Sequence, residues 1–106
     1  MIDINLTGQY LGIRAVVPSM RKAGSGAIVN ISSIGGIRSE LGVASYAASW
    51  GVRGMTKTAA LELARHNIRV NSIHPGPVRT SMATGLDAVR SRRWPSRTPL
   101  RPWRPQ

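Results

Sequence analysis

The segments Ala27-Ile-Val-Asn-Ile31 and Ile68-Arg-Val-Asn-Ser-Ile73 decide the fold, together with the stretch that joins them. Both are short, mostly apolar and rich in β-branched residues, which is the pattern of a buried parallel strand. Between them, residues 44–65 are rich in Ala, Leu, Met and Glu and predict a long helix. Two strands joined by a crossover helix predict a right-handed parallel βαβ unit.

A further helix is expected before this unit. Apolar residues recur at spacings of three and four and describe one helical face: Ile2, Leu6, Tyr10, Ile13, Val17 and Met20. Residues 22–26 predict a turn and residues 32–36 a loop. Parallel sheets need cover on both faces and usually more than two strands. The sequence therefore predicts an α/β fold that forms part of a larger domain.

Composition limits the classes of function. The chain has 106 residues, no cysteine and a formal net charge of +11. The lack of cysteine excludes disulfides, thiolate metal sites and a cysteine nucleophile, and two histidines are too few for a histidine metal cluster. No apolar run approaches the roughly 18 residues of a membrane span, and the amino end lacks signal-peptide order. We expect no metal site, no membrane segment and a cytoplasmic protein.

The carboxyl end differs from the rest. Residues 88–106 hold six Arg, four Pro, two Trp and no acidic residue. Since proline removes amide donors and fixes the backbone, we predict a folded domain at residues 1–87 and a disordered Arg/Pro-rich tail at 88–106. Arginine with tryptophan could bind nucleic acid or an anionic membrane, but a solvated segment is favoured. The tail also reads like GC-rich DNA translated out of frame, so a truncated or frame-disrupted product is a hypothesis.

Four segments carry a family resemblance: Asp3-Ile-Asn-Leu-Thr-Gly8, Ile28-Val-Asn-Ile-Ser-Ser33, Ser45-Tyr-Ala-Ala-Ser49 and Arg69-Val-Asn-Ser-Ile-His-Pro-Gly-Pro-Val-Arg-Thr80. In this order and spacing they resemble the second half of the short-chain dehydrogenase/reductase family. The amino-acid sequence at residues 50–54 and 72–76 is similar to that of the bacterial 3α,20β-hydroxysteroid dehydrogenase branch of this family. The resemblance implies a partial Rossmann-like, doubly wound parallel sheet. It also implies NAD- or NADP-dependent hydride transfer between alcohols and ketones, hydroxysteroids included.

The resemblance also implies roles for individual residues. Ser33, thirteen residues before Tyr46, matches the serine that polarises the substrate oxygen. Tyr46 matches the general acid or base, beside the nicotinamide ribose. Asn5 matches the asparagine of a proton relay through water. The loop that holds the nicotinamide carboxamide matches Pro75, Gly76, Val78 and Thr80.

Each of these residues also has a structural interpretation. Asn5 could cap a helix, Ser33 could serve its own turn, Tyr46 could be a packing residue and Pro75-Gly76 could stop a strand. These interpretations explain each residue separately but leave the joint spacing unexplained. Other polar residues are expected to be structural or exposed, and two apolar helix residues are expected to pack: Asn30, Asn71, His66 and His74, then Met55 and Leu61.

The chain departs from the family at the Tyr-x-x-x-Lys motif. Side chains at i and i+4 share one helical face, and the residue four after Tyr46 is Trp50. Loss of a lysine between Ser49 and Trp50 removes the cation that lowers the pKa of such a tyrosine. It also rotates the residues that follow by about 100°. Arg53, at i+7, is predicted to lie out of reach of the phenol, roughly 10 Å along the axis. We expect impaired catalysis.

The glycine-rich turn that receives a dinucleotide pyrophosphate is also missing from these 106 residues. Gly24-Ser-Gly26 precedes a strand and Gly35-Gly36 follows the serine loop, so both are interpreted as turns. Cofactor binding by this chain is therefore expected to be weak. In the family, helices equivalent to residues 2–20 and 44–65 form subunit contacts. An alternative function is thus a fragment that pairs with another copy or an intact relative.

Overall fold

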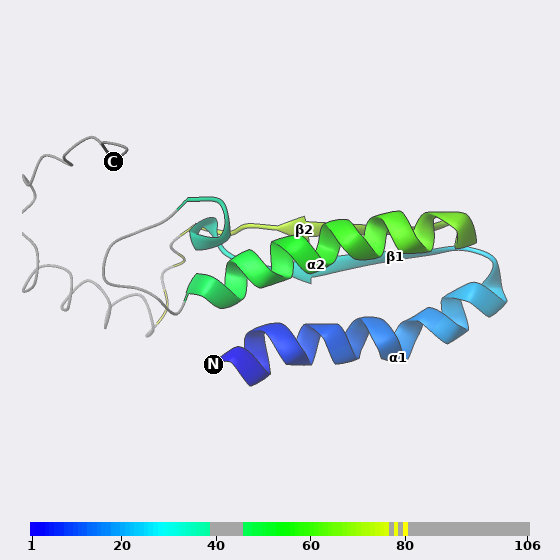
Figure 1. Cartoon of the computed structure of the whole chain (residues 1–106), viewed down its shortest axis with the longest axis horizontal. Helices are drawn as coiled ribbons and strands as arrows, with labels where there is room; N and C mark the ends of the chain where they lie inside the picture. Colours follow the sequence, from blue (N-terminus) through cyan, green and yellow to red (C-terminus); the bar gives the residue numbers. More distant parts are fainter. Residues whose placement is uncertain (39–45, 77, 79, 81–106) are drawn as a thin grey trace, which may run out of the picture. The chain divides into compact units, whose positions relative to one another are not determined.

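The computed structural model describes residues 1–38, 46–76, 78 and 80. Residues Met1–Gly76 form one compact unit. Its elements follow one another as η1 (Asp3–Thr7), α1 (Gly8–Ala23), β1 (Gly26–Ile31), η2 (Ile34–Gly36), α2 (Ala47–Leu63), η4 (Ala64–His66) and β2 (Ile68–Ile73). Figure 1 labels the two longer helices and the two strands. The predicted order of helix, strand, helix and strand is confirmed. The predicted boundary at residue 87 and the tail at 88–106 lie outside the described residues.

The two strands pair in parallel, as the sequence predicts. Their register runs from Gly26 opposite Ile68 to Ile31 opposite Ile73. Helix α2 joins the end of β1 to the start of β2, so the βαβ connection is confirmed. Because the strands are parallel, both end at the same edge of the sheet.

Helix α1 extends further than the predicted end at Met20. It continues through Pro18 to Ala23 and ends at Gly24, whose φ of 81° is left-handed and therefore favours glycine. The last turn is held by tertiary packing. A Cβ atom on Gly26 would lie 2.5 Å from the sulfur of Met20, so the methionine lies directly against the first residue of β1.

The core lies between both helices and one face of the sheet. Its buried residues are Ile13 of α1, Ala59 of α2, and Ile68 and Val70 of β2. Partly buried residues pack around them: Val17, Met20, Ile28, Met55, Ala60 and Leu63. The spacing correctly predicts Ile13, Val17 and Met20 on the inner face of α1, but Ile2 and Tyr10 of the predicted face are 50% and 49% exposed. The packing role of Met55 is confirmed. Leu61 is 83% exposed, so its predicted packing role is wrong.

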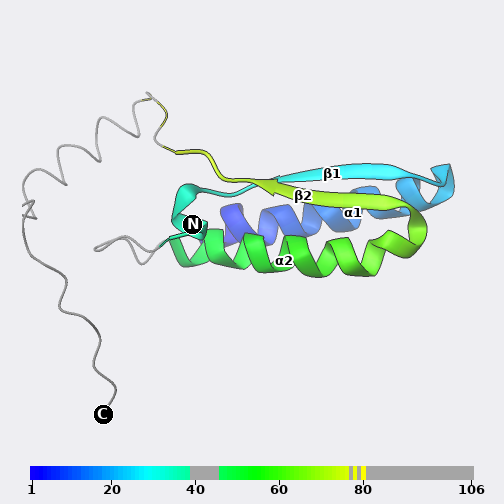
Figure 2. The same cartoon turned by 90° about the horizontal axis from the view of Figure 1, so that it is seen from above.

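The other face of the sheet is open in the part of the chain that is described. Val29, Ile31 and Ile73 point away from the helices and are 56%, 53% and 49% exposed. Figure 2 shows both helices on the same side of the two strands. The prediction of strands buried on both faces is therefore wrong for these residues, because α1 and α2 cover one face only.

A buried polar pair ties β1 to the middle of α2. The Asn30 side-chain amide donates to Thr56 Oγ1 at 2.9 Å, and the Thr56 hydroxyl donates to the Val52 carbonyl at 2.7 Å. Buried polar groups without partners are costly, and these side chains satisfy one another. The structural role predicted for Asn30 is confirmed.

Helix α2 ends as expected near residue 65. After Leu63 the chain tightens into the 3₁₀ turn η4, and Asn67 adopts a left-handed conformation with φ of 57°. The Asn67 N–H donates to the Ala64 carbonyl at 2.9 Å. This geometry turns the chain directly into β2.

Within residues 1–38 and 46–76, no helix combines the length and apolar character needed to cross a membrane.

Candidate active site

The candidate residues gather at one end of the compact unit. Figure 1 shows that both strands end where α1 and α2 begin. Ser32 and Ser33 follow β1, while His74, Pro75 and Gly76 follow β2. In open parallel sheets, ligands bind outside the carboxyl ends of the strands. The fold therefore places the predicted residues at the edge where a site is expected.

Backbone hydrogen bonds join the two loops beyond the ends of the strands. The Ser32 N–H donates to the Ile73 carbonyl and the Ile34 N–H donates to the Pro75 carbonyl, both at 2.9 Å. These bonds continue the parallel pairing past Ile31 and Ile73. The structure thus brings the predicted serine segment and the predicted Pro75-Gly76 segment side by side.

Ser33 begins the short 3₁₀ turn η2. Its backbone is extended, and its side-chain oxygen accepts the Gly35 N–H at 3.1 Å. The interpretation of Ser33 as a turn residue is therefore confirmed. A serine hydroxyl that accepts one bond keeps its own hydrogen for donation. The half-buried Ser33 can consequently serve its turn and still donate toward a substrate oxygen.

Tyr46 stands immediately before α2, with its ring against the serine loop. A Cβ atom on Gly35 would lie 2.5 Å from both the Cγ and Cδ1 atoms of the Tyr46 ring. The contact therefore requires a glycine at position 35. It places the half-buried ring two residues from Ser33, as the predicted pairing of Ser33 and Tyr46 needs.

A second contact fixes η2 against the first turn of α2. The Ser32 hydroxyl donates to the Ser49 carbonyl at 3.0 Å. A Cβ atom on Gly36 would lie 2.8 Å from both of these oxygens. Gly35 and Gly36 are therefore more than a flexible turn: both give room for α2 to approach the serine loop.

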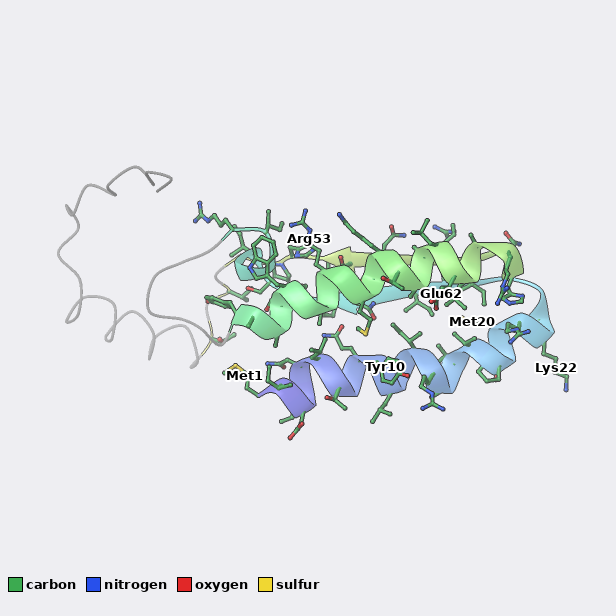
Figure 3. All side chains as sticks on the ribbon, in the orientation of Figure 1. Met1, Tyr10, Met20, Lys22, Arg53 and Glu62 are labelled. Carbon is green, nitrogen blue, oxygen red and sulfur yellow. The ribbon has the colours of Figure 1, made fainter. Side chains whose placement is uncertain are left out.

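Trp50 and Arg53 occupy the face of α2 where the family motif places its lysine. The Arg53 guanidinium lies 5.5 Å from the centroid of the Trp50 ring, and its NH1 atom donates to the Gly36 carbonyl at 3.5 Å. Figure 3 labels Arg53 on the part of α2 that lies near η2. The cation thus holds the serine loop, and no hydrogen bond joins it to Tyr46 among the described residues. Sequence spacing alone missed this contact because it depends on where the loop folds.

Asn5 lies in the π-helical turn η1, one turn before α1. Its side chain is exposed, and Ile2 and Thr7 hold the N-cap positions of η1 and α1. The capping interpretation of Asn5 is therefore wrong. A one-turn π-helix is frequently found at functional sites. Asn5 lies at the same end of the unit as the serine loop, and its catalytic role stays a prediction.

Gln9 links Asn5 to the end of β1, a connection that sequence reasoning missed. Its side-chain nitrogen donates to the Asn5 carbonyl at 2.8 Å and to the Ile31 carbonyl at 2.7 Å. Its oxygen accepts the Ile31 N–H at 3.0 Å. The Gln9 amide thus bonds both the N–H and the carbonyl of Ile31, as the backbone of a neighbouring strand would.

Turn η1 also packs directly against α2. A Cβ atom on Gly51 would lie 2.9 Å from the Leu6 Cδ2 atom. Leu6, half-buried, is therefore seated on the backbone of α2 one helical turn beyond Ala47. This contact and the Gln9 bridge together tie the Asn5 turn to both elements that carry Ser33 and Tyr46.

The residues predicted to hold the nicotinamide carboxamide divide between the loop after β2 and a second unit of the chain. Pro75 is half-buried and Gly76 exposed, and both follow β2 beside the serine loop. Val78 and Thr80 are exposed and belong to the unit Pro77–Gln106. The role predicted for these four residues stays a prediction.

His74, which the sequence predicts to be structural or exposed, contacts the serine loop directly. Its Nδ1 atom lies 3.0 Å from the Ser33 carbonyl oxygen and its Nε2 atom 3.0 Å from Ser72 Oγ. The signal that could have found it is the strand register. A histidine one residue past Ile73 falls beside the residues that follow Ile31 in the parallel partner.

Among the described residues, a shifted pKa is found at the opposite end of the helices, at His66. Partial burial lowers the pKa of His66, and the nearby positive charges of Arg21 and Arg65 lower this pKa further. Arg21 and Lys22 occupy the last turn of α1, and Arg65 lies in η4. This basic end is separate from the candidate site at the strand ends.

Known proteins match the part of the chain that carries the candidate residues. The family described as short chain dehydrogenase matches residues 1–90. A trans-4-hydroxycyclohexanecarboxylate dehydrogenase of Sinomonas cyclohexanicum is 56% identical over 86 residues, which cover 80% of this chain and 33% of that protein. A 3-alpha-(or 20-beta)-hydroxysteroid dehydrogenase of Mycobacterium tuberculosis H37Rv is 55% identical over 83 residues, covering 77% of this chain and 32% of its own length.

Solved structures of dehydrogenases and reductases superpose on this chain. NAD⁺-bound xylitol dehydrogenase superposes with a TM-score of 0.80 at 33% identity, covering 86% of this chain and 36% of that chain. A variant of actinorhodin polyketide ketoreductase with NADPH gives a TM-score of 0.77 at 42% identity, covering 85% and 36%. The chain belongs to the short-chain dehydrogenase family. It spans about a third of the length of the curated relatives it matches.

The residues around Tyr46 fit a nicotinamide cofactor incompletely. One helical turn beyond Tyr46, where an ammonium group could reach the ribose, stands the Trp50 ring beneath Arg53. Tryptophan donates only through its indole N–H and carries no charge. Since the cation of this face is turned to the Gly36 carbonyl, the described residues lack the charged group that the family site uses.

Proposed function

We propose that this chain descends from an NAD- or NADP-dependent oxidoreductase of alcohols and ketones and is itself catalytically impaired. One observation carries the proposal. The Tyr46 ring packs on Gly35 beside Ser33, while Trp50 and Arg53 stand where the motif has its lysine. In this proposal the chain keeps Ser33 and Tyr46, but its nearest cation on α2, Arg53, bonds the Gly36 carbonyl instead of lying beside Tyr46.

The roles proposed for the retained residues follow from their chemistry. Ser33 has a free hydroxyl hydrogen and is proposed to donate to a substrate carbonyl or hydroxyl oxygen. Tyr46 is proposed as the general acid or base, since a phenol can both give and take a proton. Asn5 is proposed to complete a proton relay through water from its place in η1.

The proposed substrate class is a secondary alcohol or its ketone on a ring. The printed names of the two curated relatives describe a hydroxylated cyclohexane and a hydroxylated steroid. At 56% and 55% identity, these relatives support such a substrate more than an acyclic one. A hydroxysteroid is the narrower version of the same proposal.

The cofactor of the ancestral site is proposed to be NAD or NADP, since the two structural neighbours carry NAD⁺ and NADPH. Pro75, Gly76, Val78 and Thr80 are proposed, from the family resemblance, to hold the nicotinamide carboxamide. Tyr46 is proposed to lie beside the ribose. Weak cofactor binding by the chain itself follows from the uncharged Trp50.

The outer surfaces of both helices are proposed to contact another subunit, either a second copy or an intact relative. Large apolar side chains are exposed there: Tyr10 and Leu11 on α1, and Trp50 and Leu61 on α2. Large apolar side chains exposed to solvent can mark a surface that contacts another protein when they gather into a patch. A cytoplasmic location is proposed from the sequence.

A chimera with a full-length relative tests the proposed function. Residues 1–80 of this chain would replace the matching third of the Sinomonas cyclohexanicum dehydrogenase, with and without a lysine inserted between Ser49 and Trp50. Because a positioned acid or base contributes about 10²- to 10⁴-fold, we expect the insertion to raise kcat/KM at least about a hundredfold. A Met inserted at the same place is the control for helix register. Equal activity with inserted Lys and Met would contradict the proposal.

A further inference from the structure

The His74 ring bridges the two loops of the candidate site. It follows β2, yet its Nδ1 atom contacts the carbonyl oxygen of Ser33, which follows β1, at 3.0 Å. On its other side, Nε2 lies 3.0 Å from Ser72 Oγ. The ring is half-buried, and both of its nitrogens form hydrogen bonds within the protein.

These partners fix which nitrogen carries the proton. A carbonyl oxygen only accepts hydrogen bonds, so the Nδ1 atom that faces Ser33 must carry a hydrogen. In the neutral ring, Nε2 is then an acceptor, and the hydroxyl of Ser72 is the donor that satisfies it. The contacts therefore select the Nδ1–H form of neutral His74.

The neighbouring backbone bonds show what this contact does. Ser32 and Ile34 donate to the carbonyls of Ile73 and Pro75, one on each side of Ser33. The Ser33 carbonyl accepts two hydrogen bonds, one from the Gly36 N–H at 2.8 Å within the 3₁₀ turn and one from the His74 ring at 3.0 Å. The His74 side chain thus adds, from the other loop, a second hydrogen bond to the peptide group that directly follows the candidate serine.

We propose that His74, locked in its Nδ1–H form by Ser72, is the positioning residue that orients Ser33. It acts through the Ser33 carbonyl and contacts no reacting atom. The assignment of Ser33 as the substrate-binding serine rests on the proposed function, whereas the bridge and its tautomer rest on the geometry alone.

Nitrogen NMR on the unmodified 106-residue chain tests the tautomer directly. With ¹⁵N-labelled histidine, above the pH at which imidazoles are charged, the unprotonated nitrogen of His74 is expected to be Nε2. His66, for which the structure gives no such bridge, supplies the reference signal in the same spectrum, and H66Q assigns it. A predominant Nε2–H form of His74 would overturn the proposal.

Three variants test the positioning role. His74→Asn keeps an N–H close to the place of Nδ1, His74→Phe keeps the ring without it, and Ser72→Ala removes only the outer partner. In His74→Phe, amide exchange at Ile34 and Gly35 is expected to accelerate about tenfold, which corresponds to ~1.4 kcal/mol. In His74→Asn it is expected to stay within about threefold of the unmodified chain.

Ser72→Ala should allow the Nε2–H form of His74 to become populated, and exchange at Gly35 should rise by less than in His74→Phe, because the remaining Nδ1–H form still donates to the Ser33 carbonyl. Equal exchange rates in His74→Asn and His74→Phe would refute the positioning role. None of these readouts depends on turnover, so their failure is distinguishable from failure of the proposed function.

Discussion

The ring of Tyr46 lies directly against the backbone of Gly35, so closely that a Cβ atom there would be 2.5 Å from two ring carbons. This contact joins the serine loop to the start of α2. It explains why the loop needs glycine at a position where no unusual backbone angle demands it. The Tyr46 ring can therefore approach the serine loop this closely only because Gly35 has no side chain.

Gly35→Ala should separate the two candidate residues. Since the Tyr46 ring must move to admit a methyl group, we expect the free energy of unfolding to fall by about 1–3 kcal/mol, measured by urea denaturation. Gly54→Ala is the matched control, because a Cβ atom there meets nothing within 4 Å. In the middle of α2 this control should be more stable by about 0.5–1 kcal/mol. Similar gains in both variants would show that the Tyr46 ring does not occupy this place.

The Asn30 and Thr56 pair should behave as one unit. Thr56→Val removes the acceptor of the buried Asn30 amide and is expected to lower the free energy of unfolding by about 1–3 kcal/mol. Asn30→Leu combined with Thr56→Val leaves no such orphaned amide and should cost less than the sum of the single changes. A double-mutant cycle with purely additive values would contradict the hydrogen bond.

Gln9 should be sensitive to loss of its donor hydrogens. In Gln9→Glu, a carboxylate would face the carbonyls of Asn5 and Ile31, so we expect a loss of about 1 kcal/mol of stability at neutral pH. The loss should shrink as pH falls below the ordinary glutamate pKa of about 4.3, because protonated glutamate can donate one bond. Urea midpoints of Gln9→Glu and Gln9→Leu, compared across pH, measure this. A pH-independent difference would show that the bridge contributes nothing.

His66 should make stability depend on pH in one direction. Burial lowers the pKa of His66 in the folded chain from 6.5, and the charges of Arg21 and Arg65 add to the effect. Between the folded and unfolded pKa values the unfolded chain binds more protons. The free energy of unfolding contributed by His66 therefore rises with pH up to about 6.5 and is constant above it.

His66→Gln should remove this slope, and Arg21→Gln should reduce it. Arg14→Gln is the matched control, since Arg14 lies over the Tyr10 ring on another part of α1. Denaturation curves at several pH values below 7 provide the measurement. A steeper slope in Arg21→Gln than in Arg14→Gln would contradict the assigned cause.

Local pattern predicts most of the fold. The apolar β-branched runs at residues 27–31 and 68–73 predict strands that the structure confirms, and the spacing of Ile13, Val17 and Met20 predicts the buried face of α1. The prediction fails at Leu61, which periodicity cannot separate from a packing residue. It also fails for the outer face of β1, because burial depends on which elements cover the sheet.

The sequence predicts which residues form the candidate site, from their spacing along the chain, but not the contacts that hold them in place. Ser33 and Pro75 are brought to one edge because parallel strands end there, which the βαβ pattern implies. The contacts made by Gln9 and Arg53, by contrast, join residues on separate elements to backbone carbonyls. No sequence spacing encodes such contacts, since they depend on how loops settle after the helices pack.

Turnover by the unaltered chain tests the central claim most directly. The purified 106-residue protein would be incubated with a cyclic secondary alcohol and NAD⁺ or NADP⁺, and reduced nicotinamide would be followed by its absorbance. Because Trp50 replaces the cation beside Tyr46, we predict no rate above buffer. A lysine inserted in this chain alone is not expected to restore a rate, since these 106 residues hold no glycine-rich turn for a dinucleotide pyrophosphate. Reduced nicotinamide that forms with the unaltered chain and is lost in Tyr46→Phe would contradict the account.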